Sequence, residues 1–451
     1  MSLAEKIRDN KLTRQEVLAI AFPAVLESLF NTFTSIIDST MVSALGTAAI
    51  SAIAVTTQPK LFIFAVFFAI NTAVSSLTAY YNGKKDSDGA NRIFVTAFFA
   101  VIIASIVLGL LSIAAAKPMM MLFSGQKDTL DMSIAYFRIV MGGMIFNMLF
   151  MLINSALRGC GNTKVTLSTN IVSCVLDVIF NYLLIEGHFG FPALGIKGAA
   201  IGTVAGTIGA LVVAVIYLLR SRALVDLGYC IKEKIKPGRS ALSEIFALWK
   251  SVVVENLMTR VGTLFTSSIT ARAGSFAMSL YSVGMNLMNI NFSLGNGFQA
   301  ASVALIGKSK GEGNVDDIKR YSKRILVIGL ALSVVLAILM VVFAKPYFGL
   351  YSNEEEFIRM GCISSFIIAI VAPIQVVKII YSGFLQGLGH MKETMKSSII
   401  SVTIAQPICT VILVVVLDLG LIGIWISVLL AQLIWLISMR SYYVKVAKEY
   451  F

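Results

Sequence analysis

The chain alternates between long apolar runs and short polar breaks along its whole length. A helix needs roughly 20 apolar residues to cross a bilayer, and each run is long enough to do so. Each break contains charged residues, glycine or proline. The pattern therefore predicts an all-α membrane protein with twelve transmembrane helices. Their ranges are 17–44, 50–80, 93–116, 130–157, 164–186, 195–220, 243–271, 276–306, 322–344, 356–385, 392–417 and 421–446.

Composition supports a membrane location and argues against a soluble enzyme. Apolar residues make up 57% of the 451 residues and charged residues 14%, whereas soluble domains average about 25% charged residues. The twelve spans leave little chain for a soluble domain. The sequence contains no Walker A, HExxH or GxSxG motif, each of which marks a known catalytic site. We therefore expect no enzymatic activity and no cofactor.

The net charge of +13 lies in the breaks between the apolar runs. This placement is typical of membrane topology rather than of a nucleic-acid-binding face. In or near the two termini and the breaks after even-numbered helices there are 27 Lys and Arg residues, and in or near the breaks after odd-numbered helices there are 7. Positive charge marks the cytoplasmic side. The sequence thus predicts a multi-pass protein of the cell membrane with both termini in the cytoplasm.

The second half of the chain repeats the first half at one constant offset in residue number. AKPMMMLFS (116–124) matches AKPYFGLYS (344–352), and LRGCGNTK (157–164) matches LQGLGHMK (385–392). Each copy contains six helices, so both cross the membrane in the same direction. We expect two pseudo-symmetric six-helix bundles around a central cleft. The predicted division is an N-terminal lobe (1–220), a basic cytoplasmic linker (221–245) and a C-terminal lobe (246–451).

Polar residues inside the predicted spans are the candidate functional groups, because intramembrane charge is costly and rarely kept without a role. In the first copy they recur at helical spacing on two helices, and a third helix adds a threonine. Carboxylate, amide and hydroxyl oxygens from three helices can hold a proton or Na⁺. The alternative is a set of hydrogen bonds that only holds the helices together. These residues are Glu27, Asn31, Asp38, Asn170, Asp177, Asn181 and Thr203.

The second copy has lost most of this oxygen cluster. At the positions equivalent to Asp38, Asp177 and Asn181 it has Thr266, Ala405 and Cys409. We therefore expect the N-terminal lobe to carry the ion site. Among the carboxylates in the predicted spans of the first copy, only Glu27 has a carboxylate at its equivalent position in the second copy, which is Glu255. Glu255 could form an ion pair with Lys378, and Arg260 is the alternative partner. Both Glu27 and Glu255 could instead have a purely structural role. The remaining candidates for the cleft wall are Asn147, Asn286 and Gln375.

Asp38 lies mid-helix, well after Pro23 on the same span. Burial away from water disfavours its charged form, and a bound proton or Na⁺ would offset that cost. Proline removes a helical hydrogen bond and lets a helix bend. We predict that charging and neutralising Asp38 shifts the first helix between straight and bent states.

These motifs resemble the multidrug and toxic compound extrusion (MATE) family over nearly the whole chain. SALRGCGNTK is similar to the family's LRGxGDTK loop, and LGIKGAAIGT is similar to its LGxxGAAxAT segment. The resemblance implies twelve helices in two lobes, and export of bulky, often cationic organic compounds in exchange for H⁺ or Na⁺. We expect small amphipathic substrates, lipid as the surrounding partner, no nucleic acid, and a monomer.

The resemblance also implies an ion site at Asp38, Asp177, Asn181 and Thr203. The family often has Asn followed four residues later by Asp, whereas this chain has Asp177 and then Asn181. The branch with acidic sites in the C-terminal lobe is a poorer match, since Gln375 stands where that branch has Asp.

Two other functions fit parts of the pattern. A flippase for a lipid-linked sugar shares the lobe layout, but it would be expected to have several cationic residues along the cleft, where this chain offers chiefly Lys378 and Arg260. A membrane scaffold or sensor would not need the cluster of Asp38 and Asp177. The sequence therefore favours a cation-coupled antiporter that works by alternating access.

Overall fold

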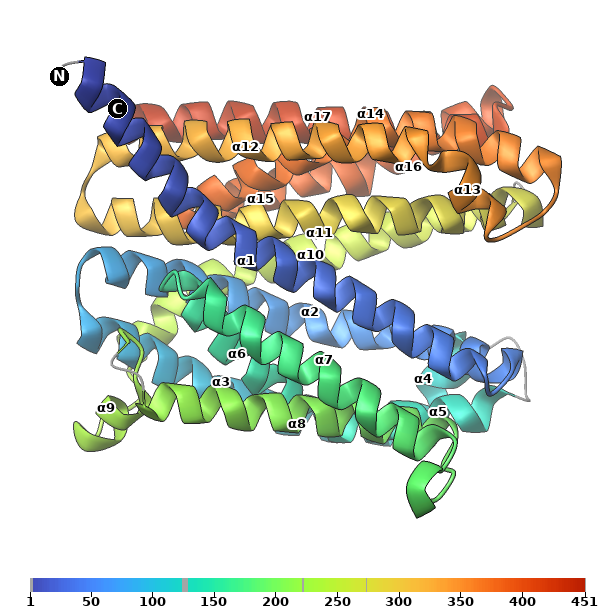
Figure 1. The fold of residues 1–451 in the computed structure, drawn as a ribbon, viewed down its shortest axis with the longest axis horizontal. Coiled ribbons are helices and arrows are strands. Elements are labelled where there is room, and N and C mark those ends of the chain that lie inside the picture. Colours follow the sequence, from blue (N-terminus) through green and yellow to red (C-terminus); the bar gives the residue numbers. More distant parts are fainter. Residues whose placement is uncertain (1–2, 124–128, 221–222, 273, 451) are drawn as a thin grey trace. The chain divides into compact units, whose positions relative to one another are not determined.

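The computed structural model describes residues 3–123, 129–220, 223–272 and 274–450. Within these ranges the chain forms helices joined by short turns, and no residue lies in a β-strand. Figure 1 shows the long helices and the short turns that connect them. The all-α prediction is therefore confirmed.

The first half of the chain contains five long helices, a bent pair and several short elements. The first four long helices are α1 (Leu3–Ser43), α2 (Thr47–Gly83), α3 (Ser87–Ala114) and α7 (Thr163–Ile185). The short helix α4 (Ala116–Phe123) precedes the bent pair α5 (Leu130–Gly142) and α6 (Met144–Gly159). The single turn η2 (His188–Gly190) is followed by another long helix, α8 (Ile196–Arg220), and the short helix α9 (Leu227–Lys232) lies in the predicted linker.

The second half repeats this order. Its long helices are α10 (Arg239–Arg272), α11 (Ser275–Glu312), α12 (Val315–Val342), α14 (Glu355–Gly387) and α17 (Gly420–Tyr450). The short helix α13 (Ala344–Gly349) follows α12. The segment 391–416 is one span made of α15 (Met391–Ser398), the π-helix η3 (Ile399–Ala405), α16 (Gln406–Thr410) and the π-helix η4 (Val411–Val416). Pro407 lies between the two π-helices and lacks a backbone N–H, so one helical hydrogen bond is missing there.

Each of the twelve predicted spans coincides with a helical segment of the described chain. Two differ in shape from the expectation. The first helix begins at Leu3 rather than at residue 17. The predicted helix 130–157 is α5 and α6, bent by 49° at Gly143. A Cβ atom at Gly143 would lie 2.5 Å from a methyl carbon of Val204, so α8 passes too close for a side chain there.

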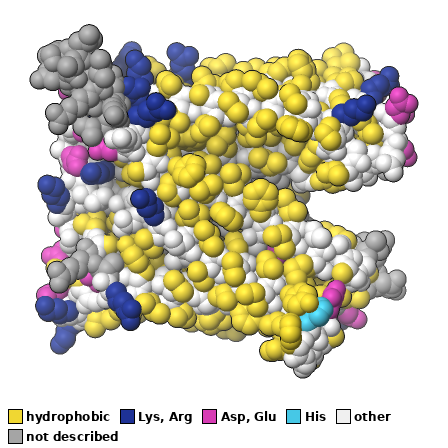
Figure 2. Space-filling view, in the orientation of Figure 1, with side chains coloured by type: hydrophobic (Ala, Val, Ile, Leu, Met, Phe, Trp, Pro, Cys, Tyr) yellow, Lys and Arg dark blue, Asp and Glu magenta, His cyan; other side chains and the backbone are white. Residues whose placement is uncertain are grey.

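Length and composition alone would not identify all twelve spans. Of the described helices, nine are long and apolar enough to cross a membrane, or ten if the bent pair counts as one span. Among the long helices, α10 and α11 fall outside this group because charged, Asn and Ser residues interrupt their apolar runs. Figure 2 shows hydrophobic side chains covering the middle of the helices, with Lys and Arg gathered near their ends.

By its contacts the chain divides into two compact units. Unit 1 comprises residues 1–28 and 250–451, and unit 2 comprises residues 29–249. Helix α1 therefore contributes its first part to unit 1 and its second part to unit 2. The division drawn from the sequence placed the whole of the first helix with the N-terminal half. It also treated 221–245 as a separate linker, of which positions 221 and 222 lie outside the described chain.

The two units repeat the same internal contacts at the offset found in the sequence. In unit 2 the Asn82 side chain donates to the Cys160 carbonyl oxygen, and in unit 1 Lys310 donates to the Leu388 carbonyl oxygen. Asp86 caps the start of α3, and its equivalent Asn314 caps the start of α12. The repeat seen in the sequence is thus a repeat of folded structure.

Candidate ion-coupling site

Four of the predicted residues lie together in unit 2. Asp177 and Asn181 are one helical turn apart on α7, and their side chains are 5% and 1% exposed. Asp38 reaches them from α1 and Thr203 from α8. Two carboxyl groups, an amide and a hydroxyl from three helices therefore converge on one point.

The amide of Asn181 joins the two carboxyl groups. Its Nδ2 donates to Asp38 Oδ1 at 3.1 Å and to Asp177 Oδ1 at 3.4 Å. The Asp38 and Asp177 carboxyl groups also contact each other, and Asp177 contacts the Thr203 hydroxyl. The Oδ1 atom of Asn181 is buried without a hydrogen-bond partner in the described chain. The cluster thus has an unused acceptor and two adjacent acids, which favours a bound proton or cation.

Glycines on α8 allow this cluster to form. Gly198, Gly202 and Gly206 recur every four residues, a spacing that lets membrane helices pack closely. A Cβ atom at Gly202 would lie 2.2 Å from Asn181 Oδ1, and one at Gly206 would lie 2.8 Å from the Asp177 backbone nitrogen. Gly198 and Gly202 belong to the LGIKGAAIGT segment, but their role in packing α8 against α7 was not predicted from the sequence.

A lysine and a tyrosine next to the carboxyl groups were also missed. Lys60 on α2 interacts electrostatically with Asp38, and Tyr136 on α5 interacts with both acids. Lys60 was recognisable as a charged residue inside a predicted span, but nothing in the sequence indicated which acid it approaches. Its ammonium partly offsets the negative charge of Asp38.

The other α1 candidates lie away from this cluster. Pro23 is buried, and α1 continues through it as one helix. Glu27 is 3% exposed and belongs to unit 1, whereas Asn31 is exposed in unit 2. The predicted polar stripe of α1 is therefore shared between the two units.

The remaining amide candidates differ in burial. Asn170 on α7 is buried and donates to the Thr166 carbonyl oxygen at 2.9 Å. Asn147 on α6 is half-buried, and Asn286 on α11 is exposed. Gln375 on α14 is 5% exposed and its Oε1 has no hydrogen-bond partner in the described chain.

In unit 1, Glu255 and Lys378 do not form a direct ion pair within the described chain. Glu255 accepts a hydrogen bond from Thr394 at 2.8 Å, and Lys378 Nζ lies 3.5 Å from the centre of the Trp435 ring. The two charges attract each other at longer range. Each charge thus has its own neutral partner in addition to the other.

The double substitution of Glu255 and Lys378 should lower the free energy of unfolding by less than the sum of the two single substitutions. A lone charge in an apolar interior is destabilising, and removing both leaves none. We expect Glu255→Gln and Lys378→Met to show a coupling free energy of about 1–3 kcal/mol in thermal unfolding of the purified protein. The control cycle pairs Lys378→Met with Lys345→Met, which removes an exposed charge on α13 and should be close to additive. Additive losses in the Glu255 and Lys378 cycle would show that the two charges do not compensate each other.

The family model MatE matches residues 23–183 and 251–412. The starts of these two segments, at positions 23 and 251, are separated by the offset of the internal repeat. The chain belongs to the multidrug and toxic compound extrusion (MATE) family. The family is one of multi-pass membrane transporters rather than enzymes, and the chain has the family's twelve-helix, two-lobe fold.

Relatives of this MATE protein match it over most of its length. The probable multidrug resistance protein NorM of Thermotoga maritima is 21% identical over 92% of this chain and 89% of its own. Multidrug resistance protein MdtK of Yersinia enterocolitica is 22% identical over 83% of this chain and 81% of its own. The solved structure of an outward-facing multidrug resistance MATE family transporter has a TM-score of 0.90 at 17% identity. The matched region covers 97% of this chain and 96% of the chain in that structure.

Proposed function

We propose that this MATE protein is a secondary antiporter that exports amphipathic, cationic organic compounds in exchange for H⁺ or Na⁺. The observation that carries the proposal is the joining of Asp38 and Asp177 through Asn181 inside unit 2. A transporter driven by an ion gradient needs an intramembrane group that takes up and releases that ion. The names of the NorM and MdtK relatives support multidrug compounds as the substrates.

The cluster would hold the coupling ion between its two acids. Two adjacent carboxylates repel each other, so a proton shared between them or a Na⁺ bound by both lowers the free energy. Asn181 fixes both carboxyl groups in place, and its free Oδ1 would add a ligand for Na⁺. Thr203 would contribute its hydroxyl oxygen.

Helix α1 would transmit the state of the cluster to the substrate. It carries Asp38 in its unit 2 part and Pro23 in its unit 1 part. Pro23 leaves one carbonyl group of the preceding turn without its helical hydrogen bond, so bending the helix there costs little free energy. Release of the ion would favour one of the straight and bent states of α1, and uptake of the ion would favour the other. The substrate would bind these two states with different affinities. Substrate and ion must then weaken each other's binding by the same factor.

Efflux from proteoliposomes tests this function. Purified protein is reconstituted with a fluorescent cationic dye, and dye movement is followed under a pH gradient and then under a Na⁺ gradient. The proposal requires dye movement against its own gradient under one of the two. Movement of a lipid-linked sugar without any ion gradient, and no dye movement, would instead identify a flippase.

We also propose that both termini and the segment 221–245 face the cytoplasm, because of the excess of Lys and Arg on that side. A membrane-impermeant maleimide should label Asn353→Cys in intact cells, but label Ser240→Cys only after the cells are opened. Both positions are exposed. Burial raises the pKa of Cys160 to about 12 and that of Cys230 to about 11, so these native thiols should react slowly. Labelling of Ser240→Cys in intact cells would reverse the orientation.

A further inference from the structure

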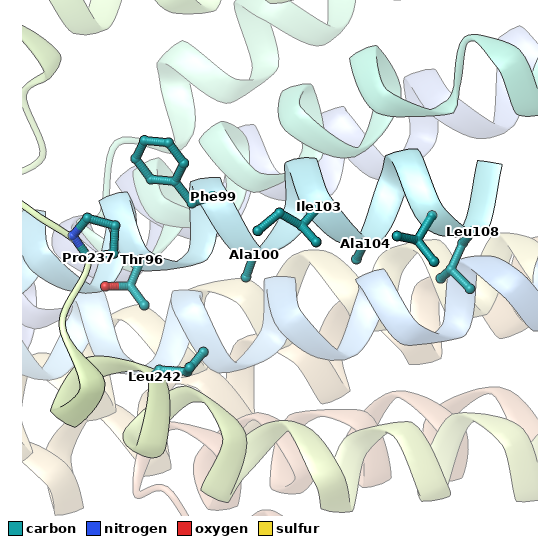
Figure 3. Close-up of a pocket in the computed structure, with 9 residues that line it drawn as sticks. Thr96, Phe99, Ala100, Ile103, Ala104, Leu108, Pro237 and Leu242 are labelled. Carbon is teal, nitrogen blue, oxygen red and sulfur yellow. The ribbon is translucent and has the colours of Figure 1, made fainter. Parts of the chain in front are cut away.

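An apolar groove of about 590 Å³ runs along α3 in unit 2 and ends where the linker enters α10. Figure 3 shows Thr96 and Pro237 at one end of the row of lining residues and Leu108 at the other, with Leu242 on the facing helix. The small side chains of Ala100 and Ala104 leave room in the middle. Exposed Phe99, Ile103 and Val107 are 48–63% accessible and also line the groove.

The groove spans a length that suits one leaflet of a bilayer. From Thr96 to Leu108 the helix rises about 18 Å, at 1.5 Å per residue. The hydrocarbon core of a bilayer is roughly 30 Å thick, so one leaflet contributes about 15 Å. An acyl chain lying along α3 would therefore fill the groove from the linker end towards the middle of the membrane.

The linker is held firmly at the open end of the groove. The Gly238 backbone N–H donates to Thr96 Oγ1 at 3.1 Å. A Cβ atom at Gly238 would lie 3.2 Å from Cδ of Arg92, so the linker passes directly over the start of α3. This contact fixes where the charged residues of the linker stand relative to the groove.

Three exposed cations belong to residues close to that end. Arg92 precedes the groove on α3, Lys236 is next to Pro237, and Arg239 begins α10. Within the described chain none of the three makes an ion pair. Their charges are thus available to an anion placed at the mouth of the groove.

We propose that the α3 groove is a binding site for an anionic phospholipid. One acyl chain lies along Ala100 and Ala104, and Arg92, Lys236 and Arg239 bind the phosphate of the headgroup. Each basic residue at the membrane surface raises the affinity for anionic lipid about fivefold. The inference concerns lipid rather than transport substrate, so it holds or fails independently of the antiporter proposal.

Native mass spectrometry of the full-length protein in detergent tests the site, with phosphatidylglycerol and phosphatidylcholine of equal chain length as the probes. We expect retention of one phosphatidylglycerol over phosphatidylcholine. Lys236→Gln together with Arg239→Gln should weaken phosphatidylglycerol binding by roughly 25-fold. Lys197→Gln together with Arg272→Gln removes the same charge at the opposite ends of α8 and α10 and should leave binding unchanged.

A second variant tests the groove rather than the charge. Ala104→Trp fills the groove and should abolish lipid retention, whereas Ile106→Trp places a tryptophan on α3 at an exposed residue that does not line the groove and should leave retention unchanged. Equal retention of the two lipids, or equal retention by both charge variants, would overturn the proposal. Displacement of the lipid by the cationic dye would assign the groove to transport substrate instead. The charge variants lie on exposed positions, so they remain informative even if Ala104→Trp does not fold.

Discussion

Asp38→Asn protein should fold normally and bind substrate, yet fail to pump it. Asparagine has the shape of the protonated acid, so the hydrogen bond to Asn181 and the packing of α1 on unit 2 are kept. It cannot release a proton or bind Na⁺ as a carboxylate does. We expect efflux under either ion gradient to fall to the rate seen without a gradient, a loss on the order of a hundredfold. Dye efflux from proteoliposomes, with dye binding measured separately, is the readout.

Three matched variants make this result specific. Asp131→Asn makes the same chemical change at an exposed position on α5 and should leave efflux unchanged. Asp177→Asn should impair efflux as Asp38→Asn does, since the two acids share one cluster. Ala405→Asp adds a carboxyl group at the position in unit 1 that is equivalent to Asp177, and it should not restore efflux to either mutant. Wild-type pumping by Asp38→Asn protein would remove Asp38 from the coupling site.

Gly206→Ala should destabilise unit 2 and disable the ion site, although it adds only one methyl group. The new Cβ would lie 2.8 and 2.9 Å from backbone atoms of Asp177, and backbone cannot rotate away. Helices α7 and α8 must therefore separate, at a cost of about 1–3 kcal/mol. We expect a lower midpoint of thermal unfolding in detergent, and lost efflux in the protein that remains folded.

The control for this effect is Gly209→Ala on the same helix. A Cβ atom there would meet only Cδ1 of Leu176 within 3 Å, the far end of a flexible side chain. It should cost little stability and leave efflux intact. If Gly206→Ala and Gly209→Ala behave alike, close packing of α8 on Asp177 does not position the site.

The helices of this protein and their repetition could be predicted from the amino-acid sequence. Long apolar runs can only be helices in a bilayer, because every backbone polar group there must be bonded within its own segment. The constant offset between the matching motifs then indicated two copies of six helices. The intramembrane positions of Asp38 and Asp177 followed from the same pattern, because charge stands out against an apolar background.

Which of these residues meet could be learned only from the folded protein. Asp38 and Glu27 share one face of α1, yet their side chains belong to different units, because α1 belongs to unit 1 before residue 29 and to unit 2 after it. Lys60 could have approached any acid of its half, and the fold brings it to Asp38. Glu255 and Lys378 have opposite charges, but Thr394 and Trp435 are their nearest partners. Helical periodicity gives the direction in which each side chain points from its helix axis. Which helix lies opposite that side chain is decided by packing, including the close packing that the glycines of α8 allow.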